Sequence, residues 1–310
     1  MAKKVFIDGK AGTTGLRIYE RLEKFEGIEL ISLSDEKRKD KECRREALNS
    51  ADIAFLCLPD DAARESVSLI ENENTVVIDT STAHRTLDDW AYGFPELSPA
   101  HREKLKNSKR IAVPGCHASG FISLVYPLVE AGALDGSENL SCFSLTGYSG
   151  GGKKMIADYE ESKDTLLNAP RQYGLAQTHK HLKEMVKITG IKNAPAFCPV
   201  VADFYSGMEV TVPIFKSDLK NGFTLEKIKE VYKNKYNCDL VKFEDELSEN
   251  GFLSAGVLSG KDSMIISVFG NEDRILLTAR YDNLGKGASG AAVECLNIVL
   301  GNADTTGLEI

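Results

Sequence analysis

The sequence predicts an α/β protein built from a doubly wound parallel sheet and an α+β part whose sheet is mostly antiparallel. In the first third of the chain, short apolar runs alternate with helical patterns, as in a parallel sheet covered on both faces. Further along, strands follow one another with few helices between them, as in an antiparallel sheet with one covered face. The length of 310 residues fits one large domain or two medium ones.

Composition indicates an ordinary cytoplasmic protein, with 42% hydrophobic and 27% charged residues. No apolar run approaches a membrane span, and the N-terminus has no secretory or transit pattern. Seven scattered cysteines, without zinc-site spacing, indicate a reduced protein and predict no bound metal. A net charge of −8 argues against nucleic acid as the main partner.

The first predicted strand, Lys3 to Ile7, leads into glycines spaced G-x-x-G-x-x-G and then into a helical pattern. Glycine lets the backbone approach a pyrophosphate, and the start of the helix supplies N–H donors. This context predicts a Rossmann-type dinucleotide site, the alternative being a glycine-rich turn without a ligand. The predicted cofactor ligands in this turn are Gly9, Gly12, Thr13, Thr14 and Gly15.

The second predicted strand, Ile28 to Leu33, ends at Ser34, where a Rossmann unit recognises the adenosine ribose. An acidic residue at this place suits the 2′-hydroxyl of NAD, whereas an arginine suits the 2′-phosphate of NADP. The chain offers both Asp35 and Arg38, so the residues alone leave the choice between the two cofactors open.

Three further apolar runs complete the parallel sheet: residues 53–58, closed by Pro59, residues 76–78, which precede Ser81, and residues 111–113. Ligands bind beyond the carboxyl ends of such strands. We therefore expect Pro59, Ser81 and Cys116 to face one crevice, with residues 90–97 as a turn-rich loop in its wall.

The second part begins with a predicted strand at residues 140–146 and continues into a glycine tract that ends in Lys153 and Lys154. The remaining pattern predicts helices at 155–167, 181–188, 225–236 and 291–300, and strands at 196–201, 207–215, 264–269 and 274–281.

Cys116 follows the Pro114–Gly115 turn at the junction between a predicted strand end and a helix start. Free N–H groups and the positive end of the helix dipole favour a thiolate there, which would make Cys116 a nucleophile. The alternative is a buried structural cysteine. His181 opens a helix and is the predicted acid/base partner. His117 follows the sulfur directly, so its ring points elsewhere on the helix.

A nucleophilic cysteine beside a nucleotide crevice indicates reduction of an activated acyl group through a thioester, with NAD(P)H as the hydride donor. An acyl phosphate that also bears a carboxylate is strongly anionic, and the net negative charge requires local cations to bind it. The candidate ligands are Arg85, Lys153, Lys154, Arg171 and Lys180, with Ser81 and Ser119 as neutral donors.

These motifs together resemble the N-acetyl-gamma-glutamyl-phosphate reductase family, in its shorter bacterial variety. The resemblance spans essentially the whole chain and rests on residues 9–15, Val-Pro-Gly-Cys116, residues 148–154, His179-Lys-His181 and residues 283–288. It implies NADPH-dependent reduction of N-acetyl-glutamyl 5-phosphate to the semialdehyde in arginine biosynthesis, in a homotetramer or homodimer. It also implies cofactor contacts at Asn283 and Gly285, and substrate contacts at Gly151 and His179.

The expected domains are a nucleotide-binding domain of residues 1–116, completed by the C-terminal helix at 285–310, and a catalytic and oligomerisation domain of residues 117–284. Aspartate-semialdehyde dehydrogenase is the nearest alternative activity, and a carrier-protein-linked aminoadipate reductase is a more distant one. An inert nucleotide sensor is the alternative from another class, and it would not need Cys116 or His181.

Overall fold

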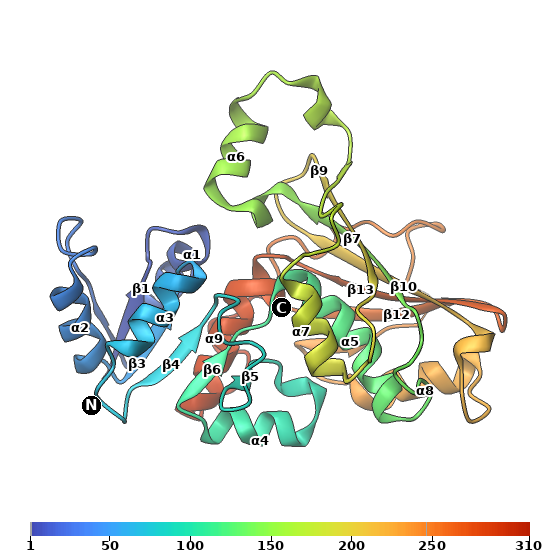
Figure 1. Cartoon of the computed structure of the whole chain (residues 1–310), viewed down its shortest axis with the longest axis horizontal. Helices are drawn as coiled ribbons and strands as arrows, with labels where there is room; N and C mark the ends of the chain where they lie inside the picture. The colour runs from blue at the N-terminus through green and yellow to red at the C-terminus, as the bar shows by residue number, and fades with distance from the viewer. Residues whose placement is uncertain (1, 246) are drawn as a thin grey trace. The chain divides into compact units, whose positions relative to one another are not determined.

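The computed structural model describes residues 2–245 and 247–310 (Figure 1). The chain divides into two compact units. Unit 1 contains the chain up to Pro114 together with Ala288–Leu308, and unit 2 contains Gly115–Gly287 together with Glu309–Ile310. Within the described ranges, no helix combines the length and the apolar character needed to cross a bilayer.

Unit 1 holds a six-stranded sheet in which every neighbouring pair is parallel. The strand order is β2-β1-β3-β4-β6-β5. The strands are β1 (Lys3–Asp8), β2 (Ile28–Ile31), β3 (Ile53–Leu56), β4 (Val76–Asp79), β5 (Ala91–Tyr92) and β6 (Arg110–Ala112).

Helices cover both faces of this sheet, which confirms the predicted doubly wound arrangement. The helices are α1 (Thr13–Leu22), α2 (Lys41–Ser50), α3 (Asp60–Ser68), α4 (Pro99–Asn107) and α9 (Gly290–Leu300). On β1, Val5 and Ile7 pack on one face with side chains of helices α1, α4 and α9. Phe6 packs on the other face with side chains of α2 and α3. The C-terminal helix therefore completes the core of unit 1.

Residues 90–97 are more ordered than the turn-rich loop that the sequence predicts. Ala91 and Tyr92 form the edge strand β5 beside β6, and Pro95–Leu97 forms a short 3₁₀ helix. Trp90, Tyr92 and Phe94 are buried, so the segment belongs to the core. A strand of only two residues is far shorter than average, and the glycine and proline beside it predict a loop instead.

Unit 2 holds a seven-stranded sheet of order β11-β12-β13-β10-β7-β9-β8. Its neighbours are antiparallel except for the pairs β11–β12 and β7–β9, as predicted for a mostly antiparallel sheet. The strands are β7 (Ser141–Gly147), β8 (Arg171–Gln172), β9 (Ala196–Ala202), β10 (Met208–Phe215), β11 (Val241–Phe243), β12 (Met264–Gly270) and β13 (Arg274–Tyr281).

One face of this sheet is covered by helices. The other face is covered in part, because Glu249 and the carbonyl of Glu244 accept hydrogen bonds there from the buried side chains of Arg280 and Ser267, and its uncovered part is the open face. Helix α5 (Cys116–Glu130) packs on β10 and β13, α8 (Leu225–Lys235) packs on β12, and α7 (His181–Thr189) packs on α5. Along β10, buried Met208, Val210, Val212 and Ile214 alternate with less buried residues, as period-2 geometry requires. The open face presents Phe143, Phe215 and Leu276, which are 49%, 53% and 43% exposed.

The helix predicted at residues 155–167 is shorter and begins earlier, as α6 (Gly152–Glu161). The backbone turns extended at Ser162, and the Asp164 side chain accepts a hydrogen bond from Leu166 N, which caps a separate 3₁₀ turn at Thr165–Asn168. A local side-chain bond thus competes with helix continuation. In Figure 1, α6 lies apart from the helices that cover the sheet, and none of its residues is buried.

Candidate active site

The glycine turn of unit 1 is as tight as a nucleotide-binding turn must be. Gly9 has φ +90°, and a Cβ built there would lie 2.3 Å from the carbonyl oxygen of Cys57. A Cβ on Gly15 would lie 2.5 Å from the oxygen of Gly9. Gly12 is the N-cap of α1, and Thr13 and Thr14 open the helix. Backbone without side chains and the free N–H groups of the first turn of α1 therefore lie together at the end of β1, as pyrophosphate binding requires.

A cavity of about 710 Å³ lies beside this turn, and unit 1 forms all of its walls. Gly9, Lys10 and Ala11 line it from the glycine turn, and Ser34, Asp35, Arg38 and Lys39 line it from the end of β2. Arg38 pairs with Asp35 at 3.1 Å, yet the Asp35 side chain is 94% exposed. The predicted adenosine-recognition residues are thus together, and two cations, Arg38 and Lys39, stand beside one acid, Asp35, on this wall.

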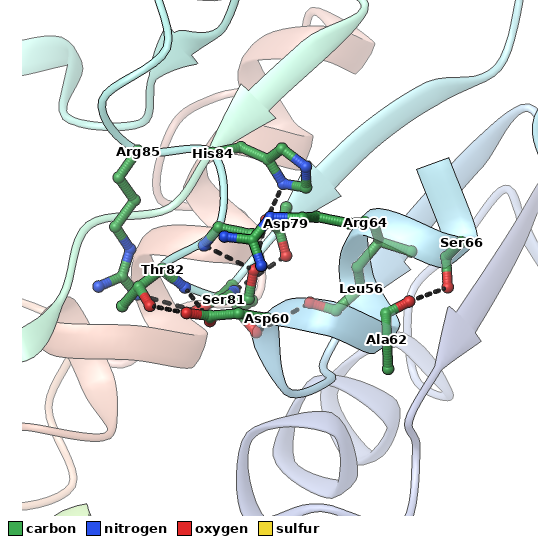
Figure 2. Close-up of polar contacts among 12 residues, drawn as sticks. Leu56, Asp60, Ala62, Arg64, Ser66, Asp79, Ser81, Thr82, His84 and Arg85 are labelled. Carbon is green, nitrogen blue, oxygen red and sulfur yellow. Dashed lines mark hydrogen bonds and ion pairs between the residues drawn. The ribbon is translucent and has the colours of Figure 1, made fainter. Parts of the chain in front are cut away.

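A buried network lies at the ends of β3 and β4 (Figure 2). Asp79 accepts hydrogen bonds from the hydroxyl of Ser81 at 2.7 Å and contacts Nδ1 of His84 at 2.6 Å. The ring of His84 stacks on Trp90. The guanidinium of buried Arg85 donates to the carbonyl of Thr80.

Pro59, the N-cap of α3, lies one residue before Asp60, which binds Thr82. The predicted residues Pro59, Ser81 and Arg85 therefore belong to neighbouring loops of unit 1. The Ser81 hydroxyl donates its hydrogen bond to the carboxylate of Asp79.

In unit 2, Cys116 is the first residue of α5 and is half-buried, with Gly115 as the N-cap. Its main chain is held on both sides. The N–H of Gly115 donates to Oε1 of Glu184 at 2.8 Å, and the hydroxyl of Tyr281 donates to the carbonyl of Cys116 at 2.5 Å. The same hydroxyl accepts from the N–H of Gly120. Burial raises the pKa of Tyr281 well above its usual value, so the phenol keeps its proton.

The three histidines of unit 2 form one cluster with different environments. His117 is buried between Ser144 and Tyr173, which contact its Nδ1 and Nε2 at 2.7 and 2.6 Å. Burial lowers the pKa of His117 to about 3, so its ring is neutral. His179 accepts the backbone N–H of His181 at Nδ1, and burial also lowers its pKa. His181 opens α7, with its ring 4.6 Å from that of His179.

The glycine tract leads into α6, whose first turn carries Lys153 and Lys154 and no acidic residue. Gly151 is its N-cap. Asn283 is buried in the same unit, where its amide accepts from Gly207 N and donates to the Ser149 hydroxyl. Gly285 packs so closely that a Cβ would lie 1.9 Å from the oxygen of Lys261.

The remaining predicted anion ligands differ in exposure. Arg171 on β8 and Lys180, the N-cap of α7, are both exposed. Ser119 is buried on α5, where its hydroxyl donates to Gly115 O. Among the described residues, no group of His, Cys, Asp and Glu side chains has the arrangement of a metal site.

Sequence reasoning missed Glu184 and Tyr281, the two side chains that hold the Cys116 junction. Glu184 lies three residues after His181, on the same face of α7, so the helical spacing could have indicated it. Tyr281 ends a strand more than 160 residues away from Cys116 in the chain, and its hydroxyl gives no local pattern.

Comparisons with known proteins identify one family along the chain. A model described as semialdehyde dehydrogenase, NAD binding domain, matches residues 4–107, and the corresponding dimerisation domain model matches residues 116–283. The chain is 44% identical to N-acetyl-gamma-glutamyl-phosphate reductase 2 of Nostoc sp., over 98% of this chain and 99% of that protein. It is also 44% identical to N-acetyl-gamma-glutamyl-phosphate reductase of Brucella ovis, over 97% and 100%.

Solved structures show the same fold. The aspartate semialdehyde dehydrogenase II of Vibrio cholerae complexed with ASA has a TM-score of 0.74 at 17% identity, covering 97% of this chain and 99% of that one. The enzyme of Francisella tularensis has a TM-score of 0.72 at 18% identity, covering 97% and 100%.

Replacing Tyr281 with Phe tests whether the hydrogen bond from its hydroxyl to the carbonyl of Cys116 positions that residue. Tyr236→Phe is a matched control, because its buried hydroxyl donates to Ser123 O on the same helix α5. Each variant should lose about 1 kcal/mol of unfolding free energy in urea. Only Tyr281→Phe should change the alkylation rate of Cys116 by iodoacetamide. Equal rates in both variants would contradict the assigned role of Tyr281.

Proposed function

Because the chain belongs to the N-acetyl-gamma-glutamyl-phosphate reductases within the semialdehyde dehydrogenase family, we propose that it reduces N-acetyl-L-glutamyl 5-phosphate to the 5-semialdehyde through a Cys116 thioester. This activity is a step of arginine biosynthesis. The observation that carries the proposal is a half-buried cysteine at the start of α5, in the same unit as a histidine that starts α7.

The sulfur of Cys116 attacks the acyl carbon, and the bond from that carbon to the phosphate oxygen breaks as phosphate leaves with its electron pair. The N-terminus of α5 favours the thiolate that this step requires. A reduced nicotinamide, when bound, would supply the hydride that adds to the carbonyl carbon of the resulting Cys116 thioester and gives a thiohemiacetal. The thiohemiacetal on Cys116 then collapses, the C–S bond breaks, and the aldehyde leaves while the thiolate is restored.

His181 moves the proton in this scheme. It protonates the oxygen of the thiohemiacetal and takes that proton back as the aldehyde forms. The neighbouring histidines are less suited to this task. The pKa of His117 is lowered to about 3, and Nδ1 of His179 already accepts the N–H of His181. The lowered pKa of His117 keeps that ring neutral near pH 7, and burial also lowers the pKa of His179.

The residues of unit 1 fit a dinucleotide, and we assign it as NADP. An added Cβ at Gly9 or Gly15 would clash with backbone atoms of the turn. Gly12 is the N-cap of α1, and all three glycines are proposed pyrophosphate contacts. Thr13, Thr14, Pro59 and Ser81 are the further proposed contacts in unit 1, and Asn283 and Gly285 are those in unit 2. Arg38 and Lys39 line the cavity beside a single acid, Asp35, which pairs with Arg38. This arrangement suits a 2′-phosphate better than the 2′-hydroxyl of NAD.

The anionic substrate requires cations and neutral donors, and the chain offers both kinds. Lys153 and Lys154 are exposed at the N-terminus of α6, where the helix dipole also attracts an anion. Arg85 is a buried cation of unit 1. The complete proposed set of substrate contacts is Arg85, Ser119, Gly151, Lys153, Lys154 and His179.

We assign self-association to the open face of the unit 2 sheet. Phe143, Phe215 and Leu276 are exposed on this face, and such an apolar surface is typical of a protein contact. The match to a dimerisation domain over residues 116–283 makes a second copy of the chain the partner. The expected assembly is a homodimer or homotetramer.

All seven cysteines lie in the described ranges and none forms a disulfide, as suits the reducing cytoplasm.

Cys116→Ser tests the nucleophile in the oxidative assay with N-acetylglutamate semialdehyde, phosphate and NADP. A hydroxyl is a far weaker nucleophile than a thiolate, so we expect a loss of at least ~1,000-fold. His181→Asn should lose about 100-fold. Cys198→Ser, which changes a cysteine of strand β9, should keep the parental rate. Full activity of Cys116→Ser, or faster turnover of aspartate semialdehyde by the parent, would refute the assignment.

Arg38→Ala tests the choice of cofactor. Loss of a charge-assisted hydrogen bond to a 2′-phosphate should raise the KM for NADP roughly 10- to 100-fold. The KM for NAD should stay within about 3-fold, because NAD lacks this phosphate. Lys24→Ala removes an exposed cation outside the cavity and should change neither value. A parallel rise for both cofactors would show that Arg38 does not read the 2′-phosphate.

Phe143→Lys tests the open face. A lysine placed in an apolar contact between copies should shift the sedimentation coefficient toward that of a monomer. Leu87→Lys, at a similarly exposed apolar residue of unit 1, is the control and should leave the assembly intact. Assembly that survives in Phe143→Lys would place the contact elsewhere.

A further inference from the structure

Glu184 is a buried carboxylate that none of the proposed chemical steps uses. Its residue is 2% exposed, and it lies in the first turn of α7, where the helix dipole favours an acidic side chain. A carboxylate is costly to bury unless hydrogen bonds compensate the lost hydration. Oε1 accepts the N–H of Gly115 at 2.8 Å, and this bond reaches 69 residues back along the chain.

This bond joins the two elements that carry the reacting groups. Gly115 is the residue directly before Cys116, and its extended backbone leads into α5. Glu184 lies one helical turn after His181, so both side chains emerge from the same face of α7. Helices α5 and α7 also pack against each other. One carboxylate therefore fixes the main chain of the nucleophile to the helix of the proton carrier.

We propose that Glu184 is a positioning residue, which sets where Cys116 stands relative to His181 by accepting the Gly115 N–H. This inference rests on the proposed thioester chemistry. Glu184 does not touch the substrate; it acts through the backbone. A displacement of about 1 Å between reacting groups can cost on the order of 100-fold in rate, which is the scale expected when this bond is lost.

Two substitutions separate the hydrogen bond from the charge. Glu184→Gln keeps a carbonyl oxygen of the same reach, which accepts the Gly115 N–H without a negative charge. Glu184→Met keeps the length of the side chain but has no comparable acceptor. Glu138 supplies the matched control, because it is also a buried carboxylate of unit 2 and accepts the N–H groups of Asp135 and Gly136.

The experiment measures kcat, KM and the alkylation rate of Cys116 in the full-length variants. We expect Glu184→Met to lose about 100-fold in kcat with KM within about 3-fold, and its Cys116 alkylation rate to change. Glu184→Gln should stay within about 5-fold of the parent in kcat. Glu138→Met should lose stability in urea but keep the parental kcat.

Three results would overturn the inference. Parental kcat in Glu184→Met would show that the bond does not position the sulfur. An equal loss in Glu184→Gln would assign the effect to charge, and an equal loss in Glu138→Met would assign it to general destabilisation. Because alkylation of Cys116 needs neither substrate nor cofactor, a changed rate in Glu184→Met supports the positioning role even if Cys116→Ser refutes the proposed reaction.

Discussion

Two hydrogen bonds to the main chain hold the start of α5, and the chemistry that we propose for unit 2 depends on them. Glu184 accepts the N–H before the cysteine, and Tyr281 donates to the carbonyl of the cysteine itself. A nucleophile at a helix N-terminus gains from the dipole only while the first turn stays formed. The two side chains come from α7 and β13, so the helix layer and the sheet both fix the position of Cys116.

Unit 1 uses a comparable device at the end of its first strand. The buried carboxylate of Asp8 accepts hydrogen bonds from Arg44 and from the hydroxyl of Ser66, and Arg44 also pairs with Glu65. These contacts tie β1 to α2 and α3, directly before Gly9. A buried charge whose partners all bind it stays in place, because loss of one partner would leave the buried charge uncompensated. The glycine turn therefore starts from a fixed strand end.

Much of this architecture was predictable from local patterns. The glycines before α1 and the apolar runs of the parallel strands follow from period and turn chemistry, and the structure confirms the doubly wound sheet. Cys116 and His181 begin helices as their sequence context predicts. Their catalytic roles remain predictions, since the fold alone does not test them. The edge strand at Ala91–Tyr92 was not predictable, because two residues carry no period.

The contacts that complete the site lie beyond the reach of local reasoning. The pairing of Glu184 with Gly115 and of Tyr281 with Cys116 depends on tertiary packing across long stretches of chain. The same packing explains why His117, although next to the cysteine, is enclosed as a neutral ring by Ser144 and Tyr173. The sequence predicts what these side chains can do chemically, but it does not predict which residues they contact.

We propose that Cys116 is reactive because of the position in which Glu184 and Tyr281 hold it. Competitive labelling with limiting iodoacetamide near neutral pH, read by mass spectrometry at each cysteine, measures this reactivity. Cys238 is the internal comparison, because it is exposed whereas Cys116 is half-buried. A thiolate at the N-terminus of α5 should make Cys116 the first cysteine to be labelled, despite its lower exposure. Labelling of Cys238 ahead of Cys116 would contradict it.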